Sequence, residues 1–123
     1  MKQISESEML HRAAAYCSAS ERCIQDVEKK IKAAGLAGEE SDRIVSRLLQ
    51  ERFIDESRFA RYFVNDKLRF NKWGRVKINY EMQRKGIPSS IRSEVLEGID
   101  EQEYRSILLS LLKSKKKATR GKD

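Results

Sequence analysis

A six-residue motif in this chain returns, in a loose form, 45 residues later. The segment Ile54-Asp55-Glu56-Ser57-Arg58-Phe59 comes back as Ile99-Asp100-Glu101-Gln102-Glu103-Tyr104. Gly35-Leu36 and Gly86-Ile87 form a second matched pair, and each closes a stretch of helical periodicity. Repetition at this period is typical of a stack of small helical units, which usually offers a binding surface and not an enclosed pocket. We therefore predict an all-α fold of tandem three-helix repeats in an elongated, curved stack.

The composition suits a thin stack better than a thick globule. Of the 123 residues, 39% are hydrophobic and 37% are charged. A compact globule of this length normally has a larger apolar share, whereas a thin stack has more surface for its volume. The sustained helical periodicity argues against disorder.

The charge is unevenly distributed along the chain. The formal net charge is +7, but residues 1–56 carry 9 Lys/Arg against 11 Asp/Glu, whereas residues 57–123 carry 17 against 8. A basic half of this size indicates an anionic partner, most simply nucleic acid, or an acidic protein face. The alternative is that the charge serves solubility alone.

Periodicity and helix-ending residues predict seven helices. They cover about residues 5–17, 18–34, 40–52, 56–70, 75–85, 88–98 and 100–114. The second is expected to open at a capping box, Ser18-Ala19-Ser20-Glu21, in which the Ser oxygen and the Glu carboxylate satisfy free backbone N–H groups. The predicted organisation is a first three-helix repeat over 1–53, a second over 54–98, the first helix of an incomplete third repeat over 99–114, and a basic disordered tail over 115–123.

The fifth segment has a pattern that on its own is typical of a strand, because its apolar residues alternate with polar ones. These apolar residues are Val76, Ile78, Tyr80 and Met82. The internal repeat favours a helix, because Ile78 and Met82 align with an apolar pair of the second predicted helix. That pair is Val27 and Ile31, and the second helix shows no alternation.

Two cysteines and a single histidine give little support for catalysis or metal binding. Cys17 and Cys23 lack zinc-ligand spacing and lie where a helix needs small buried residues, and His11 has no evident catalytic partner. The acidic pairs at 55–56 and 100–101 fall at helix starts, where carboxylates cap free N–H groups. We expect no enzyme activity, no metal and no cofactor.

Neither a membrane anchor nor a secretion signal is indicated. No apolar run approaches the ~18 residues of a membrane span. The N-terminal segment lacks an apolar signal core. The expected location is the reducing cytoplasm, without membrane contact.

The most informative segment for function is a basic stretch with interleaved aromatic residues. Residues 67–85 contain seven Lys/Arg and one acid, Glu81, together with Phe70, Trp73 and Tyr80. Lys and Arg neutralise phosphates, and exposed aromatic rings stack on bases or grip a protein partner. Trp73 has two alternatives, since it is either exposed for such contacts or plugs the junction between two helices.

Two segments of the chain form a specific combination of motifs. The first is Phe53-Ile54-Asp55-Glu56-Ser57-Arg58-Phe59-Ala60, and the second, which follows Gly74, is Met82-Gln83-Arg84-Lys85-Gly86-Ile87. Together they resemble the RecX regulatory-protein family. The resemblance covers about residues 40–112. Glu56 stands where a second Asp is common and Met82 where a Leu is common, so charge or volume is kept. Family members usually complete a third three-helix unit, and the resemblance therefore implies a truncated form.

The resemblance implies a modulator of the bacterial RecA recombinase that acts in DNA repair, DNA recombination and the SOS response. Such proteins bind the RecA–DNA filament in its groove and suppress its ATPase, strand-exchange and co-protease activities. We expect a monomer that meets DNA weakly or through the filament. The motif residues are interpreted as caps and core, so contact residues are inferred from charge and position. They are Arg58, Arg61, Lys67, Arg69, Lys72, Arg75, Lys77, Arg84 and Lys85.

Two other function classes remain open on the residues alone. One is a stand-alone helical DNA-binding module, such as a helix-turn-helix transcription regulator, with which the same basic stretch is compatible. The other is a nuclease or other enzyme, which requires a cluster of carboxylates in one pocket.

Overall fold

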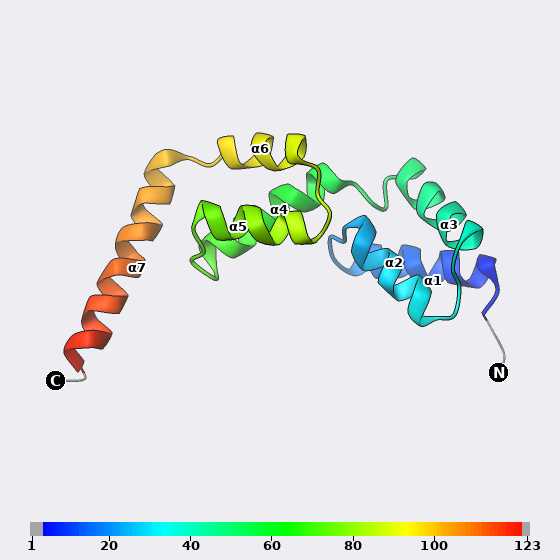
Figure 1. Ribbon diagram of the computed structural model, residues 1–123, viewed down its shortest axis with the longest axis horizontal. Coiled ribbons are helices and arrows are strands. Elements are labelled where there is room, and N and C mark those ends of the chain that lie inside the picture. Colours follow the sequence, from blue (N-terminus) through cyan, green and yellow to red (C-terminus); the bar gives the residue numbers. More distant parts are fainter. Residues whose placement is uncertain (1–3, 122–123) are drawn as a thin grey trace.

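The computed structural model is elongated and all-α, which confirms the predicted fold class (Figure 1). The structure describes the backbone of residues 4–121 and the side chains of residues 4–113. Over residues 4–121 there are seven helices and no strand, and none of these helices is long and apolar enough to span a membrane. The helices are α1 (Glu6–Ala19), α2 (Ile24–Ala33), α3 (Glu39–Gln50), α4 (Glu56–Arg69), α5 (Arg75–Arg84), α6 (Ser89–Glu97) and α7 (Glu101–Gly121).

The first three helices surround one hydrophobic core at the N-terminal end of the molecule (Figure 1). Each contributes residues at helical spacing, as an amphipathic helix must when it packs against two neighbours. The chain after α3 closes this core with Ile54. Its buried members are Met9, Ala13, Cys17, Val27, Ile31, Leu36, Ile44, Val45, Leu48 and Ile54.

A second hydrophobic core lies among α4, α5 and α6. Three of its residues come from outside these helices, because Cys23 precedes α2, Ile87 lies in the turn between α5 and α6, and Ile107 belongs to α7. The other buried members are Phe59, Ala60, Phe63, Val64, Leu68, Ile78 and Met82. Two cores are compatible with the predicted three-helix repeats, whose boundaries remain a prediction.

The repeated glycines end equivalent helices in the same way. Gly35 and Gly86 have φ of 94° and 80°, a left-handed conformation that costs a residue with a Cβ atom. The following residue then donates from its backbone N–H to a carbonyl near the helix end, at 3.2 Å for Leu36 to Ile31 and 3.1 Å for Ile87 to Met82. This is the Schellman arrangement, and it buries Leu36 and Ile87 against the two cores.

The predicted start of α2 is wrong. Ser18 and Ala19 continue α1, and α2 begins at Ile24 after an extended segment. The observed capping box uses Cys23 and Asp26, with the Asp26 carboxylate accepting from the Cys23 N–H at 3.2 Å. The later start has a tertiary cause, because the extended segment lets Cys23 reach the second core.

The fifth segment is a helix, as the internal repeat predicted. Ile78 and Met82 are fully buried, whereas Val76 and Tyr80 are 85% and 58% exposed. Residues four apart share a face of a helix, so the alternation combines an inward pair with an outward pair. The strand-like pattern therefore arises from two large apolar residues that face solvent.

The last helix is longer than predicted. Its backbone is helical from Glu101 to Gly121, whereas the sequence predicted an end near residue 114 and a disordered tail over 115–123. The segment after residue 114 is rich in Lys and contains no Pro, a composition with good helix propensity. Residues 122 and 123 lie outside the described part.

Replacing Phe59 with Ala should lower the free energy of unfolding by roughly 3–5 kcal/mol, the usual cost of removing a buried Phe ring. Phe59 is 4% exposed and stacks on Phe63 with ring centroids 5.8 Å apart. Phe70 provides a matched control, because the same residue type is 82% exposed there. Urea denaturation should show Phe70→Ala within about 0.5 kcal/mol of wild type. Equal effects of the two changes would contradict the packing.

Candidate partner interface

The outward face of α5 exposes large apolar side chains beside cations. Val76 and Tyr80 stand four residues apart on it, and Arg84 continues the same row with its guanidinium 5.9 Å from the Tyr80 ring. Lys77 lies beside this row and is also exposed. An aliphatic and an aromatic side chain in solvent, flanked by cations, offer both contact area and charge to a partner.

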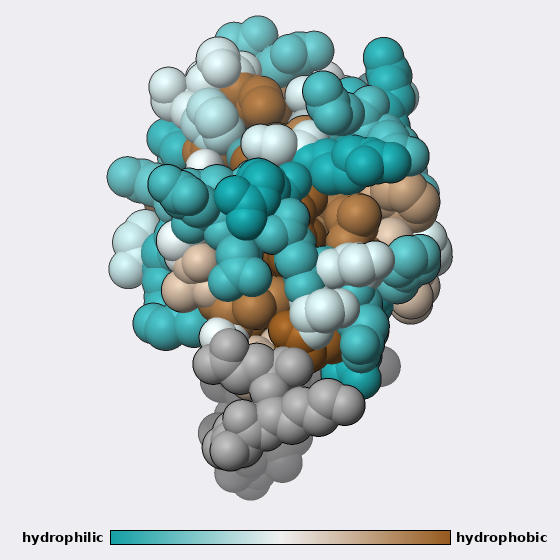
Figure 2. Space-filling view, turned by 90° about the vertical axis from the view of Figure 1, so that its right-hand side faces the viewer, coloured by the Kyte–Doolittle hydropathy of each residue, from teal (hydrophilic) through white to brown (hydrophobic). Residues whose placement is uncertain are grey.

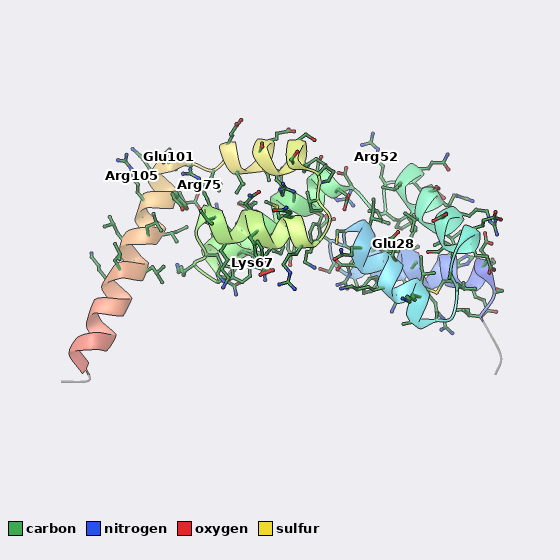
Figure 3. The ribbon with its side chains drawn as sticks, in the orientation of Figure 1. Glu28, Arg52, Lys67, Arg75, Glu101 and Arg105 are labelled. Carbon is green, nitrogen blue, oxygen red and sulfur yellow. The ribbon has the colours of Figure 1, made fainter. Side chains whose placement is uncertain are left out.

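Trp73 lies in the loop before α5 and packs against the second core, as the junction-plugging alternative predicted. Its ring meets Phe63 edge-on, with centroids 6.3 Å apart. The ammonium groups of Lys67 and Lys77 lie 5.2 Å and 4.5 Å from the Trp73 ring centroid. Lys67, marked in Figure 3, also pairs with Asp66 at 3.5 Å. Favourable cation–π contacts therefore hold two of the predicted contact residues around one half-buried ring.

Two other predicted contact residues attach α7 to the rest of the molecule. Arg69 pairs with Glu103 at 2.7 Å, and Arg75 pairs with Glu101 at 2.6 Å, where Figure 3 shows the two labelled side chains together. The backbone N–H of Arg75 donates to the Tyr104 hydroxyl at 3.1 Å, and the Arg75 guanidinium lies 4.1 Å from the Tyr104 ring centroid. These side chains are thus engaged within the chain.

Arg58 and Lys85 lie where the first three helices meet the next three. Arg58 Nε donates to both carboxylate oxygens of Glu21, at 2.7 and 2.9 Å. Lys85 pairs with Asp26 at 3.2 Å. The sequence prediction treated both cations as surface contacts, whereas the structure places both in ion pairs between α4–α5 and the segment that begins α2.

Among residues 4–113, the four remaining predicted residues form no ion pair with another helix. Within residues 4–113, no ion pair involves Arg61, Lys72 or Lys77. Arg84 pairs with its helix neighbour Glu81 at 3.3 Å and is mostly exposed. The structure thus brings Lys77 and Arg84 together on α5, places Lys72 in the preceding loop and leaves Arg61 apart on α4. Whether any of the nine residues touches a partner remains a prediction.

Sequence reasoning missed a basic contribution from the first half of the chain. A groove lies between α2 and the end of α5. Lys29 and Gln25 line its α2 side, and Glu81, Arg84 and Lys85 line the other side. The internal repeat offered the signal, because α2 and α5 both end in the repeated glycine turn. The slightly negative net charge of residues 1–56 gave no indication of a basic residue at this surface.

The opposite end of the molecule has mixed charge. Figure 2 views the α1–α3 end, where apolar groups show between hydrophilic side chains. A hollow between α1 and α3 is bordered by Arg43 and Arg47 as well as by Glu6 and Asp42. Arg43 forms a 2.7 Å ion pair with Glu6 across it. The cations there are balanced, so this end is a poorer candidate for an anionic partner than α5.

Burial and hydrogen bonding shift the pKa values of the groups where α1–α3 meet α4–α6. It raises the pKa of Glu56, although the Ile24 N–H donates to that carboxylate at 3.3 Å and opposes the shift. Burial alone would raise the pKa of Asp26 as well. Hydrogen bonds from Cys23 and Lys85 to its carboxylate outweigh this effect and lower the Asp26 pKa. Burial raises the pKa of Cys23 to about 11. The Cys23 thiol is therefore protonated at neutral pH and is no nucleophile.

The described residues contain no group of three or more His, Cys, Asp or Glu side chains that could hold a metal ion. His11 is exposed, and its Nδ1 lies 2.9 Å from the Ser7 carbonyl oxygen. That contact holds the ring on the surface of its own helix.

Comparison with known proteins identifies several relatives that are named as regulatory proteins. The family model described as "RecX, second three-helix domain" matches residues 55–96. The regulatory protein RecX of Prosthecochloris aestuarii is 32% identical over 91 residues, which cover 74% of this chain and 60% of that protein. The regulatory protein RecX of Lactobacillus johnsonii is 26% identical over 113 residues, covering 92% of this chain and 42% of that protein. The chain thus spans less than two thirds of the length of either relative.

The fold is also similar to a solved structure. The crystal structure of RecX from Lactobacillus salivarius superposes with a TM-score of 0.78 at 19% identity. The superposition covers 89% of this chain and 71% of that one. At this identity the likeness establishes the fold alone.

Replacing Glu56 with Gln should make folding stability less dependent on pH. Because the folded pKa of Glu56 is raised, the folded chain binds the proton more tightly than the unfolded chain. Wild-type stability should therefore fall as pH rises from the ordinary glutamate pKa through the folded one. The Gln amide oxygen can still accept from the Ile24 N–H. The stability of Glu56→Gln should therefore not fall with pH in this range, and its urea midpoint should exceed that of wild type above the folded pKa of Glu56. Glu97→Gln, at an exposed position, is the control and should keep the wild-type profile.

Proposed function

The chain belongs to the RecX family of regulatory proteins, and from that membership we propose that it binds the RecA–DNA filament and restrains it. The restrained activities are the ATPase, strand exchange and co-protease action of RecA, as the family resemblance implies. The protein would then act in the cytoplasm, as a monomer, in DNA repair, recombination and the SOS response.

The observation that carries the proposal is the outward face of α5. Its exposed Val76 and Tyr80 give an apolar contact, and Lys77 and Arg84 beside them give positive charge. The groove with Lys29 extends this basic surface onto α2. A nucleoprotein filament presents both protein surface and phosphates, so a mixed apolar and cationic face suits it better than a purely charged one.

Long-range attraction between the cations and the filament would speed and orient the encounter, and should weaken as salt rises. We propose Arg61, Lys72, Lys77 and Arg84 as the contacts among the nine predicted residues. Lys77 also contacts the Trp73 ring, but its side chain is exposed and forms no ion pair among residues 4–113. The other five are ion-paired within the chain to another helix, to the segment before α2 or, for Lys67, to its neighbour Asp66. These are Arg58, Lys67, Arg69, Arg75 and Lys85.

The second candidate is a stand-alone DNA-binding module that places its third helix in the major groove. In the α4–α6 set that helix is α6, which carries one Arg and two Glu. Arg92 is already bonded to the Asn79 side-chain oxygen at 3.0 Å and to the Ile87 carbonyl at 2.8 Å. The α6 face therefore offers few groups for reading base edges, which favours the filament proposal.

One titration separates the two candidates. The wild-type chain should slow the DNA-dependent ATPase of RecA at concentrations that barely shift the same DNA in a mobility assay without RecA. A DNA-binding module should do the reverse, shifting naked DNA first. No effect on the ATPase at saturating chain would overturn the proposed function.

Reversing two charges on α5 should weaken inhibition and leave the fold intact. Lys77→Glu/Arg84→Glu should raise the half-inhibitory concentration at least about tenfold, because two cations of the proposed contact face become anions. Arg75, one of the nine predicted contact residues, is unsuitable for this test because it anchors α7. The control is Arg12→Glu/Arg47→Glu, an equal charge change on exposed positions of α1 and α3. Equal loss in both variants would mean that net charge, and not the α5 face, determines binding.

A further inference from the structure

The two sets of helices are joined by one short covalent link and by several polar contacts. The link is residues 51–55, between the end of α3 and the start of α4. A five-residue loop alone would let the sets rotate against each other, because exposed loops have few fixed contacts. The polar contacts, together with the buried Cys23 side chain, are therefore what can hold them in one orientation.

Arg58 makes the most extensive of these contacts. Besides its two hydrogen bonds to Glu21, its Nη2 donates to the Arg52 carbonyl oxygen at 3.1 Å and lies 3.4 Å from that of Phe53. One guanidinium thus binds both the segment before α2 and the covalent link itself. The Nε–H is shared between the two Glu21 oxygens while Nη2 binds the link, so the planar guanidinium is fixed in direction as well as in distance.

A second contact lies along the groove between α2 and α5. Lys85 pairs with Asp26, and the Gln25 amide nitrogen donates to the Arg84 carbonyl oxygen at 3.1 Å. Asp26 also caps α2 through the Cys23 N–H. The end of α5 is therefore attached to the beginning of α2 by side chains from both.

The third contact runs from α4 to α2. The Glu56 carboxylate of α4 accepts from the first N–H of α2, at Ile24. Beside it, Cys23 is fully buried in the core of α4–α6 although it belongs to the chain before α2. These contacts at the start of α2 limit its freedom relative to α4 and α5.

We propose that these contacts form an inter-unit clamp, and that Arg58 and Lys85 are positioning residues which align the outward faces of α2 and α5 on one filament. The clamp consists of Glu21–Arg58, Asp26–Lys85 and Glu56–Ile24. This inference rests on the proposed filament binding. When two linked surfaces engage one target together, the second engages at high effective concentration, provided that geometry lets both reach. Loosening the clamp should therefore weaken inhibition without removing any contact to the filament.

A charge-swap cycle tests this inference. Arg58→Glu places two carboxylates together and should open the joint, seen as a larger maximum dimension in small-angle X-ray scattering of the free chain. The same variant should raise the half-inhibitory concentration for the RecA ATPase at least about tenfold. The swap Glu21→Arg/Arg58→Glu restores an opposite-charge pair and should return both quantities toward wild type. Arg12→Glu, with the same charge change far from the joint, should alter neither.

Other results would overturn the proposal. A swap that restores the shape but not the inhibition would make Arg58 a direct contact, and an unchanged shape in Arg58→Glu would mean that the clamp sets no orientation.

Circular dichroism melting checks that the variants fold, and Glu21→Gln is a milder variant with a smaller expected shift of the same sign. Failure of the proposed function is seen separately, as absence of inhibition by the wild-type chain, because scattering reports on the clamp without any partner.

Discussion

The burial of Cys23 in the core of α4–α6 is the constraint on which the arrangement of the other elements depends. It carries the chain between α1 and α2 across to the neighbouring helices, where Glu21 and Asp26 meet Arg58 and Lys85. It also brings the start of α2 beside α4, so that Glu56 can cap it. Without the insertion of Cys23, the start of α2 would not be held beside α5, where the two helices line one groove.

The cations of this protein divide into two kinds that look alike in the sequence. Arg58, Arg69, Arg75 and Lys85 join helices to one another through carboxylates, and a cation used in this way has less of its charge left for a partner. Lys77 and Arg84 instead flank exposed apolar side chains on α5. The proposed function depends on the second kind, and the proposed clamp depends on the first.

Much of the fold follows from local patterns that a reader can see in the chain. Helix spans, the glycine turns at Gly35 and Gly86, and the cap at Asp55, which accepts from the Arg58 N–H at 3.0 Å, are set by neighbouring residues. The start of α2 could not be predicted in this way, because the capping pattern at Ser18 is locally as good as the one at Cys23. Only burial in a distant core decides between them.

The sequence by itself determined an all-α chain, the places where its helices turn, its family resemblance and the existence of a basic stretch. These are encoded by residues close together along the chain, where spacing and backbone preference act directly. Only the tertiary structure decided which cations are free, which join α7 or the two helix sets, and that Lys29 of α2 lies across a groove from Arg84. A charge finds its counter-charge through space, and partners such as Arg58 and Glu21 or Lys85 and Asp26 are far apart in the chain until the helices pack.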